Sequence, residues 1–248
     1  MKKKQVGTFL IILISFSVVI GLFISNPILQ DESYHHFSDT KTFFSIPNFW
    51  NVMSNFPFLM VGGLGLYKIK NFTELKVHQF VFYAGVSLVA FGSGYYHLLP
   101  NSNTLFWDRL PMTIAFMALF ATIIAQFYNF NLGKKVIFPL LFIGLFSVLY
   151  WKFGATQDLR MYILVQFYPI LIIPILLFFF KNPQQKTAGY WFLLLAYVIA
   201  KFFEYFDAEI HHFLKIISGH SLKHIMVAFG LYVLLIQTIP NFIKKNDR

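Results

Sequence analysis

The chain contains no cysteine in its 248 residues. Disulfides, thiolate nucleophiles and thiolate metal ligands are therefore excluded, and any metal site must be built from His, Asp, Glu or water. Charge is scarce as well, because Asp, Glu, Lys and Arg make up 12% of the residues, whereas a soluble domain carries about 25%. A chain so poor in charge does not have the composition of a soluble domain.

Apolar residues take the place of the missing charge, at 57% of the chain with 20% aromatic residues and a mean hydropathy of +0.63. A bilayer span needs roughly 20 mainly apolar residues. The apolar runs are continuous rather than alternating, which favours helices over a strand-built barrel. The sequence thus predicts an all-α polytopic transmembrane bundle, with a seven-helix core plus one additional N-terminal transmembrane segment. The eight predicted spans are 6–26, 49–67, 78–99, 109–128, 135–151, 160–180, 189–206 and 220–240.

The first span has some features of a secretory signal peptide, because Lys2, Lys3 and Lys4 precede the apolar run. The run of about 20 residues exceeds the usual 7–15 of a signal peptide, and no small-x-small cleavage site follows it. We therefore predict that residues 1–28 form a membrane anchor and that residues 29–248 form the seven-helix membrane domain. Cleavage of the first span would leave seven helices and the same site.

The net charge of +10 does not indicate nucleic-acid binding, because the basic residues lie in short loops between apolar runs. Such loops set membrane topology, since Lys and Arg accumulate on the cytoplasmic side. With both termini placed in the cytoplasm, 13 of the 20 Lys and Arg fall on that side. This orientation places His97, Asp108, His220 and His224 together at the outer side, although they were not used to choose it.

Ionisable residues at the ends of spans are costly and often mark a functional site. Ser93 and His97 are four residues apart, as are His220 and His224, so each pair shares one helix face. Three imidazoles are a sufficient ligand set for a catalytic zinc with an open position. Each residue also has an ordinary explanation: interfacial histidines, a small packing residue at Ser93, and an ion pair of Asp108 with Arg109 at a helix N-terminus.

Two further polar clusters stand apart from these residues. Asp31, Glu32 and Asp39 follow the first span and could bind calcium through oxygen ligands, although a hydrophilic loop is the ordinary interpretation. The stretch 201–215 holds acids and histidines that could form a second metal site. An amphipathic interfacial or loop segment with a solvated charged face explains this stretch more simply.

The polar constellation resembles the alkaline ceramidase family, within the wider CREST group of seven-helix membrane hydrolases. The likeness covers roughly residues 30–241 and consists of S-x-x-x-H, an Asp eleven residues after that His, and H-x-x-x-H in the final helix. Local text agrees with it: N-F-W-N-V-M-S-N at 48–55, S-G-Y-Y-H-L-L-P at 93–100, W-D-R-L-P-M-T at 107–113 and S-G-H-S-L-K-H at 218–224. The resemblance implies that His97, His220 and His224 ligate zinc, with Ser93 and Asp108 beside it as catalytic residues.

The chain departs from the family pattern in two places. Family members carry an acidic N-terminal segment that binds calcium and ends in a Glu before F-W-N, where this chain has Asn48. Asp31, Glu32 and Asp39 do not fall at the matching spacing, and the first span is additional to the family's seven helices. A calcium site at these acids is therefore expected less than the zinc site.

The expected function is that of a zinc-dependent integral-membrane lipid amidase, which hydrolyses a ceramide-like N-acyl sphingoid to a sphingoid base and a fatty acid. Its partners would be the bilayer and a membrane lipid substrate, and not nucleic acid. Three alternatives remain open at this point. They are an ester-cleaving lipid hydrolase, a zinc-containing receptor without turnover, and a proton- or ion-coupled transporter, although the internal repeats common in transporters are not evident.

Overall fold

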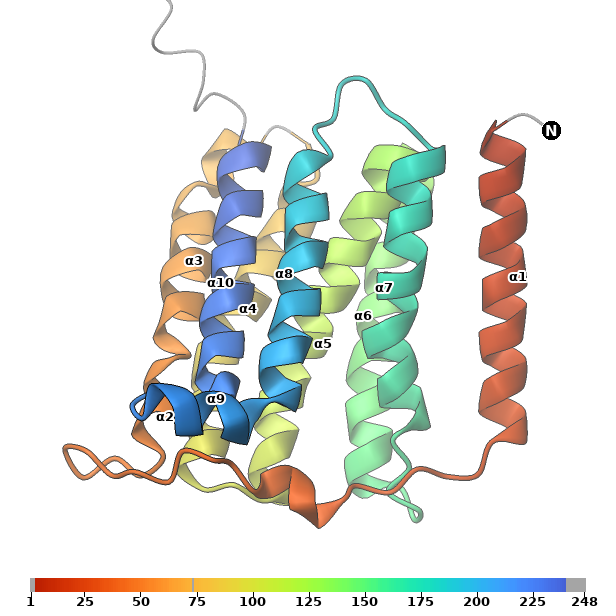
Figure 1. Ribbon diagram of the computed structural model, residues 1–248. Helices are drawn as coiled ribbons and strands as arrows, with labels where there is room; N and C mark the ends of the chain where they lie inside the picture. Colours follow the sequence, from red (N-terminus) through yellow and green to blue (C-terminus); the bar gives the residue numbers. More distant parts are fainter. Residues whose placement is uncertain (1–2, 73, 240–248) are drawn as a thin grey trace, which may run out of the picture. The chain divides into compact units, whose positions relative to one another are not determined.

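The computed structural model describes residues 3–72 and 74–239, which form helices joined by short connections (Figure 1). Within this part of the chain there is no strand, only an isolated β-bridge between Phe43 and Ile46. The expectation of an all-helical bundle is confirmed. The cytoplasmic prediction for Lys2, Lys244, Lys245 and Arg248 falls on residues outside the described part.

The chain divides into two compact units, one formed by Met1–Gln30 with Thr113–Gln185 and the other by Asp31–Met112 with Lys186–Arg248. The first span is therefore grouped with the middle of the chain, and its predicted status as a separate anchor stays a prediction. Helix α5 contributes its first part to the second unit and its remainder to the first. We call the first of the two units the middle unit and the second the site unit.

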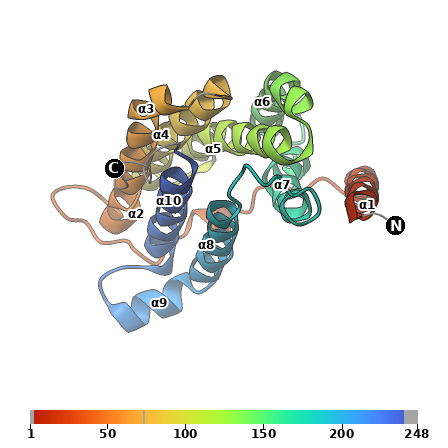
Figure 2. The same ribbon diagram turned by 90° about the horizontal axis from the view of Figure 1, so that it is seen from above.

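The middle unit contains the end of α5, a π-helical turn η3 and three long helices (Figure 2). Helix α7 packs against α1, α6 and η3. Polar contacts join the end of α1 to the start of α7. The Asp158 carboxylate accepts a hydrogen bond from the Ile28 amide. The Arg160 guanidinium donates to Asp158 and to the carbonyl oxygens of Leu22 and Ser25. The helices are α1 (Lys3–Ile24), η3 (Ile124–Tyr128), α6 (Phe130–Phe153) and α7 (Arg160–Phe179).

These contacts fix the residues that directly follow α1. Burial alone would raise the pKa of Asp158, but hydrogen bonds from the Arg160 and Ile28 amides and the Arg160 charge hold that pKa below its ordinary value. The ionised carboxylate therefore remains paired at neutral pH. Ser15 of α1 also hydrogen-bonds to Tyr168 of α7 at 2.7 Å. Helix α1 thus packs against α7 within the middle unit.

The site unit is built around two pairs of packed helices, α3 with α4 and α8 with α10, and α10 also packs against α3 (Figure 2). Helix α9 follows α8 and lies across the end of this unit where α10 begins (Figure 1). The helices are α2 (Phe49–Met53), α3 (Phe56–Tyr67), α4 (Lys76–Leu98), α5 (Ser102–Ile123), α8 (Ala188–Tyr205), α9 (Asp207–Leu214) and α10 (Gly219–Thr238). A 3₁₀ turn, η1 (Glu32–His35), precedes them.

The second predicted span, 49–67, is not one helix, because it breaks at Ser54 and Asn55 between α2 and α3. Both side chains bond back to the carbonyl of Asn51, at 3.1 Å from Ser54 Oγ and 2.8 Å from Asn55 Nδ2. Such local bonds offer the backbone an alternative to a continuous helix. The break places short polar side chains inside the unit instead of another turn of apolar residues.

Helix α5 begins at Ser102, seven residues before the predicted start at 109. The Asn101 side chain accepts from the amides of Asn103 and Thr104 at 2.8 and 3.1 Å, which satisfies two donors that have no partner within the helix. Asp108 therefore lies in the second turn of α5 and not at its N-terminus. Because Asp108 lies within the helix, the helical geometry of α5 fixes the direction of its side chain.

Six helices in the described residues are long and apolar enough to cross a bilayer, which supports a membrane protein. Two predicted spans are not among them. Helix α3 has 12 residues, about 18 Å at 1.5 Å per residue, and α8 carries Lys201 and Glu204 in its last turns. The six are Lys3–Ile24, Lys76–Leu98, Ser102–Tyr128, Phe130–Phe153, Arg160–Phe179 and Gly219–Thr238.

Candidate metal centre

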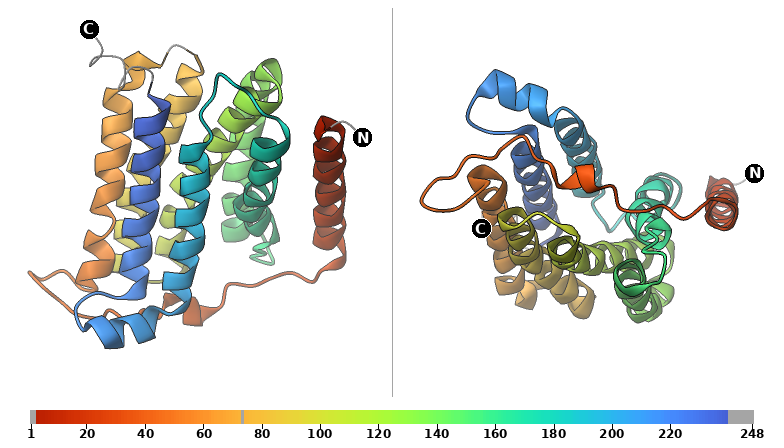
Figure 3. Two further views of the ribbon diagram at one scale, coloured as in Figure 1. Left: turned by 45° about the horizontal axis from the view of Figure 1, so that its top comes forward. Right: turned by 90° about the horizontal axis from the view of Figure 1, so that it is seen from below.

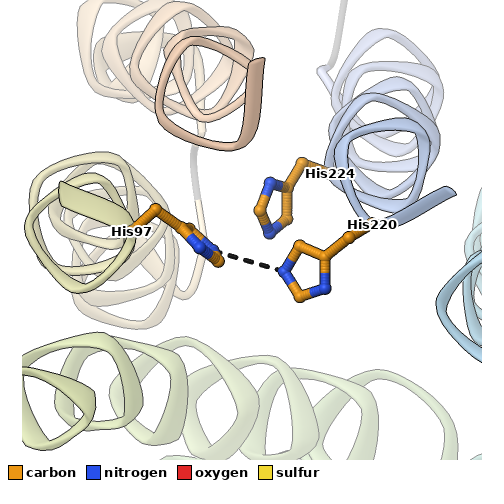
Figure 4. A group of neighbouring side chains, drawn as sticks. All are labelled: His97, His220 and His224. Carbon is orange, nitrogen blue, oxygen red and sulfur yellow. Dashed lines mark hydrogen bonds between the residues drawn. The ribbon is translucent and has the colours of Figure 1, made fainter. Parts of the chain in front are cut away.

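Three buried imidazoles from two helices converge inside the site unit (Figure 4). His97 comes from the last turn of α4, and His220 and His224 come from the first turns of α10. The Nε2 atoms of His97 and His220 are 3.3 Å apart, and one ligand nitrogen from each ring lies within 4.8 Å of the others. The predicted association of these three residues is confirmed.

The spacing of the rings fits a tetrahedral metal. Two ligands at about 2.0–2.1 Å from a zinc ion, at the tetrahedral angle, are separated by roughly 3.3–3.4 Å. The measured 3.3 Å between the His97 and His220 nitrogens matches that separation. The ring centroids lie 4.8–5.1 Å apart, so the imidazoles surround one point instead of stacking. The group could hold a metal ion, and three nitrogen donors suit zinc.

Ser54 determines which nitrogen of His224 is free for a metal. Its hydroxyl donates to the Asn51 carbonyl, so its lone pairs are left to accept from His224 Nδ1, 2.8 Å away. A proton on Nδ1 leaves the Nε2 lone pair available. Fixing the tautomer through the second ring nitrogen is the usual role of groups around a metal ligand. Ser54 is thus a positioning residue that the sequence interpretation did not identify.

Ser93 and Asp108 meet because α4 and α5 approach closely at Gly92. A Cβ on Gly92 would lie 2.0 Å from the Trp107 carbonyl oxygen, so only glycine fits there. The Ser93 side chain hydrogen-bonds to Asp108, and Ser93 is one turn before His97 on α4. Gly94, the next glycine of α4, has open space beside it, so the close approach is confined to Gly92. Ser93 therefore does more than pack.

The segment 37–51 runs along the end of the site unit at which α10 begins (Figure 3). The Phe37 ring packs on His97 and His220, with centroids 4.7 and 4.5 Å away. The Asn48 side-chain amide donates to the His97 carbonyl at 2.7 Å. We call residues 37–51 the covering segment. It shields two of the three imidazoles with an aromatic ring.

His35 anchors the chain just before the covering segment. Its Nδ1 hydrogen-bonds to Tyr96 Oη at 2.9 Å and its Nε2 to Ser102 Oγ at 3.1 Å. Burial lowers the pKa of His35, although the charge of Glu32 opposes this shift. The neutral ring is therefore favoured, and its two nitrogens join the covering segment to the ends of α4 and α5.

The three predicted calcium ligands do not form a ligand group within the described residues. Asp39 is fully buried, and its oxygens accept from the amides of Lys41, Trp50 and Asn51. Asp31 accepts from the Ser33 amide at 2.8 Å, a bond that lowers its pKa. The carboxylate of Asp39 holds the start of α2, so a calcium role for Asp31, Glu32 and Asp39 stays a prediction without geometric support.

The stretch 201–215 includes the amphipathic helix α9, which has no buried residue, and it also makes specific contacts. Asp207 accepts from the His220 amide at 2.7 Å and from the Ser38 amide at 2.9 Å, and His211 hydrogen-bonds to Ser38 Oγ at 2.8 Å. Asp207 thus fixes the start of α10 and the covering segment together. Its position in a charged run gave no sign of this role.

Arg109 is buried and does not lie at the surface, where the alternative explanation of Asp108 and Arg109 as a surface ion pair would place it. The side chain is 5% exposed, and its guanidinium lies 5.6 Å from the centroid of the Tyr34 ring. The Asp108 carboxylate accepts a hydrogen bond from Ser93. It also interacts electrostatically with the positive charges of Lys223 and Arg109.

Comparison of the chain with protein-family models, curated proteins and solved structures finds no match. The family resemblance therefore rests on the motifs themselves. The structure adds that the three histidines of those motifs are one buried group, and that the Ser and Asp are hydrogen-bonded to each other.

Proposed function

We propose that the chain is a zinc-dependent integral-membrane amidase that hydrolyses a ceramide-like N-acyl lipid. One observation carries this proposal: a buried three-histidine group lies one helical turn from a serine–aspartate pair. A purely structural metal would need only the histidines. The adjacent carboxylate supplies what hydrolysis requires, a group that can accept and return a proton.

Zinc in this site would supply a Lewis acid and would lower the pKa of a water to about 7. The protein's own residues do the rest. Asp108 accepts the proton of the attacking water and then donates it to the leaving nitrogen. Ser93 first donates its hydroxyl proton to the ionised Asp108 carboxylate and holds it in place. Once Asp108 has taken up the proton of the water, the Ser93 hydroxyl is released to donate to the oxyanion. Phe37 covers His97 and His220 and keeps bulk water from that side.

The proposal includes a topology of seven core helices and one N-terminal span, with both termini in the cytoplasm and the metal centre toward the outer side. The excess of basic residues in alternate connections supports it. Because the chain has no cysteine, single cysteines can be introduced at Ser38 and Asn246 and labelled from one side of the membrane. Labelling of both positions from the same side would contradict this topology.

Metal analysis and a lipid-hydrolysis screen on purified protein test the function together. We expect about one zinc per chain, and the His97→Ala/His220→Ala double variant should lose it with all turnover. The variant Ser147→Ala, which removes a buried hydroxyl of the middle unit, is the control that should retain both. Full zinc retention by the double variant would refute the site.

The screen also separates the alternatives. Cleavage of ester lipids but not of amides would indicate an esterase. Bound zinc without turnover of either class would indicate a receptor. A chain without metal that shows pH-dependent ion flux would be a transporter.

A further inference from the structure

Lys223 lies in the same turns of α10 as the two metal-binding histidines, three residues after His220 and directly before His224. Residues three apart share a helix face, so Lys223 follows His220 along α10. Its side chain is 18% exposed. Its charge acts on all three imidazoles and on the Asp108 carboxylate. A fixed ammonium therefore belongs to the polar surroundings of the metal centre.

The charge of Lys223 is compensated only in part. Its ammonium lies 2.5 Å from Oε1 of Glu204 on α8, but Oε2 of the same carboxylate is paired with Lys201. One negative charge is thus shared by two positive ones. The net charge stays at +1 when the Asp108 carboxylate and the Arg109 guanidinium, which also act on this group, are counted with the three residues. The Lys201 side chain is 43% exposed, whereas that of Lys223 is only 18% exposed. Charges inside membrane-spanning segments are costly and usually serve a function.

Two roles for Lys223 give different expectations. As a strut between α8 and α10 it would need Glu204 alone, and neutralising either residue would have the same effect. As a ligand-binding group it would use the remaining donors of its ammonium, since Glu204 takes one of three. A neutral lipid would gain little from this cation. A lipid with an anion beside its amide would gain a charge-assisted hydrogen bond.

We propose that Lys223 makes the site selective for N-acyl lipids that carry an anionic group, a phosphate, sulfonate or carboxylate, next to the scissile amide. This inference rests on the proposed amidase function and names its substrate class. The position of Lys223 beside the metal-binding histidines carries it, together with the sharing of Glu204. Lys223 is then a specificity-determining residue, and the Glu204 carboxylate competes with the substrate anion for its ammonium.

The test compares two substrates that differ only in the anion, N-palmitoyl sphingosine and its 1-phosphate, with N-palmitoylglycine as the carboxylate probe. Wild-type protein should prefer the phosphate or the carboxylate by about 10- to 100-fold in kcat/KM, as expected for a hydrogen bond to a charged group. Preference for only one of the two identifies the source of the anion. Lys223→Gln should abolish the preference, mainly through KM, and Lys223→Arg should retain much of it.

The variants Glu204→Gln and Lys201→Gln separate the two roles. Glu204→Gln should keep or increase the preference for the anion, because it removes the competing carboxylate. Lys201→Gln should lower the preference, because Glu204 is then left to Lys223 alone. Lys181→Gln, which removes an exposed lysine of the middle unit, is the control that should leave the preference unchanged. The double variant Glu204→Gln/Lys223→Gln removes the pair without leaving an unpaired buried charge, so it should fold and bind zinc without any preference.

Three results would overturn the inference. If Lys223→Gln and Glu204→Gln lower turnover of all substrates alike, with unchanged preference, Lys223 is a strut. If wild-type protein cleaves the neutral ceramide as well as its 1-phosphate and N-palmitoylglycine, the substrate class is wrong while the amidase function stands. If zinc-loaded protein cleaves none of these amides, the proposed function fails as well.

Discussion

The two units of this chain use polar side chains in different ways. In the middle unit, buried hydroxyls of Thr122 and Ser147 donate to carbonyls of their own helices, and Ser15–Tyr168 is a polar contact between helices. In the site unit, polar side chains bond to one another across helices, as Ser54 does to His224 and Ser218 to Asn51. A polar residue in a membrane-spanning helix therefore does not by itself indicate a functional site.

The difference lies in what each polar group is bonded to. A hydroxyl that donates to a carbonyl oxygen of its own helix needs no partner from another helix. Such a helix can therefore pack through apolar contacts alone. A side chain bonded to another helix fixes the position and protonation of its partner. Changes in the site unit should therefore alter metal binding and chemistry, whereas changes in the middle unit should alter stability alone.

The largest effect should come from Asp108→Asn. Loss of a general acid–base group typically lowers a rate by about 10²–10⁴-fold. Asparagine keeps the size and the hydrogen bond to Ser93, so zinc content and folding should stay unchanged. Ceramide hydrolysis measured alongside zinc content checks this. Ser93→Ala should be milder, on the order of 10²-fold if its hydroxyl assists the oxyanion.

Activity near that of the wild type in Asp108→Asn would remove the carboxylate from the mechanism. Loss of zinc in the same variant would show that α4 and α5 need the Asp108 carboxylate for assembly. The effect on turnover could then not be assigned to proton transfer.

An intermediate effect is expected from Ser54→Ala. Without the hydroxyl, His224 Nδ1 loses its acceptor and the ring can adopt the tautomer that protonates the metal-facing nitrogen. Groups of this kind typically contribute about 10–100-fold to metal affinity. Zinc affinity should fall by that factor when it is measured by competition with a chelator, and Ser54→Thr should restore part of it.

The middle unit supplies the matched control for this change. Ser147 is equally buried and donates 2.7 Å to the Gly144 carbonyl of its own helix. Ser147→Ala should leave zinc affinity unchanged. Equal losses in the two alanine variants would mean that hydroxyls act through general packing, contrary to the comparison.

The smallest effect should come from Arg160→Met in the middle unit. It removes an ion pair of 2.7 Å with Asp158 and the bonds to the carbonyls after α1. Hydrogen bonds to charged groups contribute about 1.5–3 kcal/mol, so the free energy of unfolding should fall by about that amount. Thermal unfolding in detergent measures it, with exposed Lys181→Met as control, and zinc content should not change.

The apolar pattern predicted the position of every long helix, because burial in lipid leaves a continuous signal in the sequence. It failed at Ser54 and Asn55, where side chains compete for the backbone of the second span. It also misplaced the start of α5, since Asn101 caps a polar first turn that hydropathy does not register. Local hydrogen bonds decided both boundaries.

The three clustered histidines could be predicted because the spacing of His220 and His224 repeats a helical turn. The residues that position them could not be identified in the same way. Ser54 and Asn51 are polar residues in a predicted span, which was an available signal, but Asp207 lies in a charged run that resembles a solvated surface. Its contacts to His220 and Ser38 join residues distant in sequence, so only the folded chain reveals them.

The site unit is built from two stretches of the chain that are synthesised at different times, so the three histidines come together late in assembly. His97 precedes His220 by 123 residues, and the whole of 113–185, which belongs to the other unit, is made between them. At about 5–20 residues per second, the ribosome adds His220 roughly 6–25 s after His97. A metal can be captured by all three imidazoles only after α10 has been inserted. A filled metal centre therefore reports that the last helix has joined its unit.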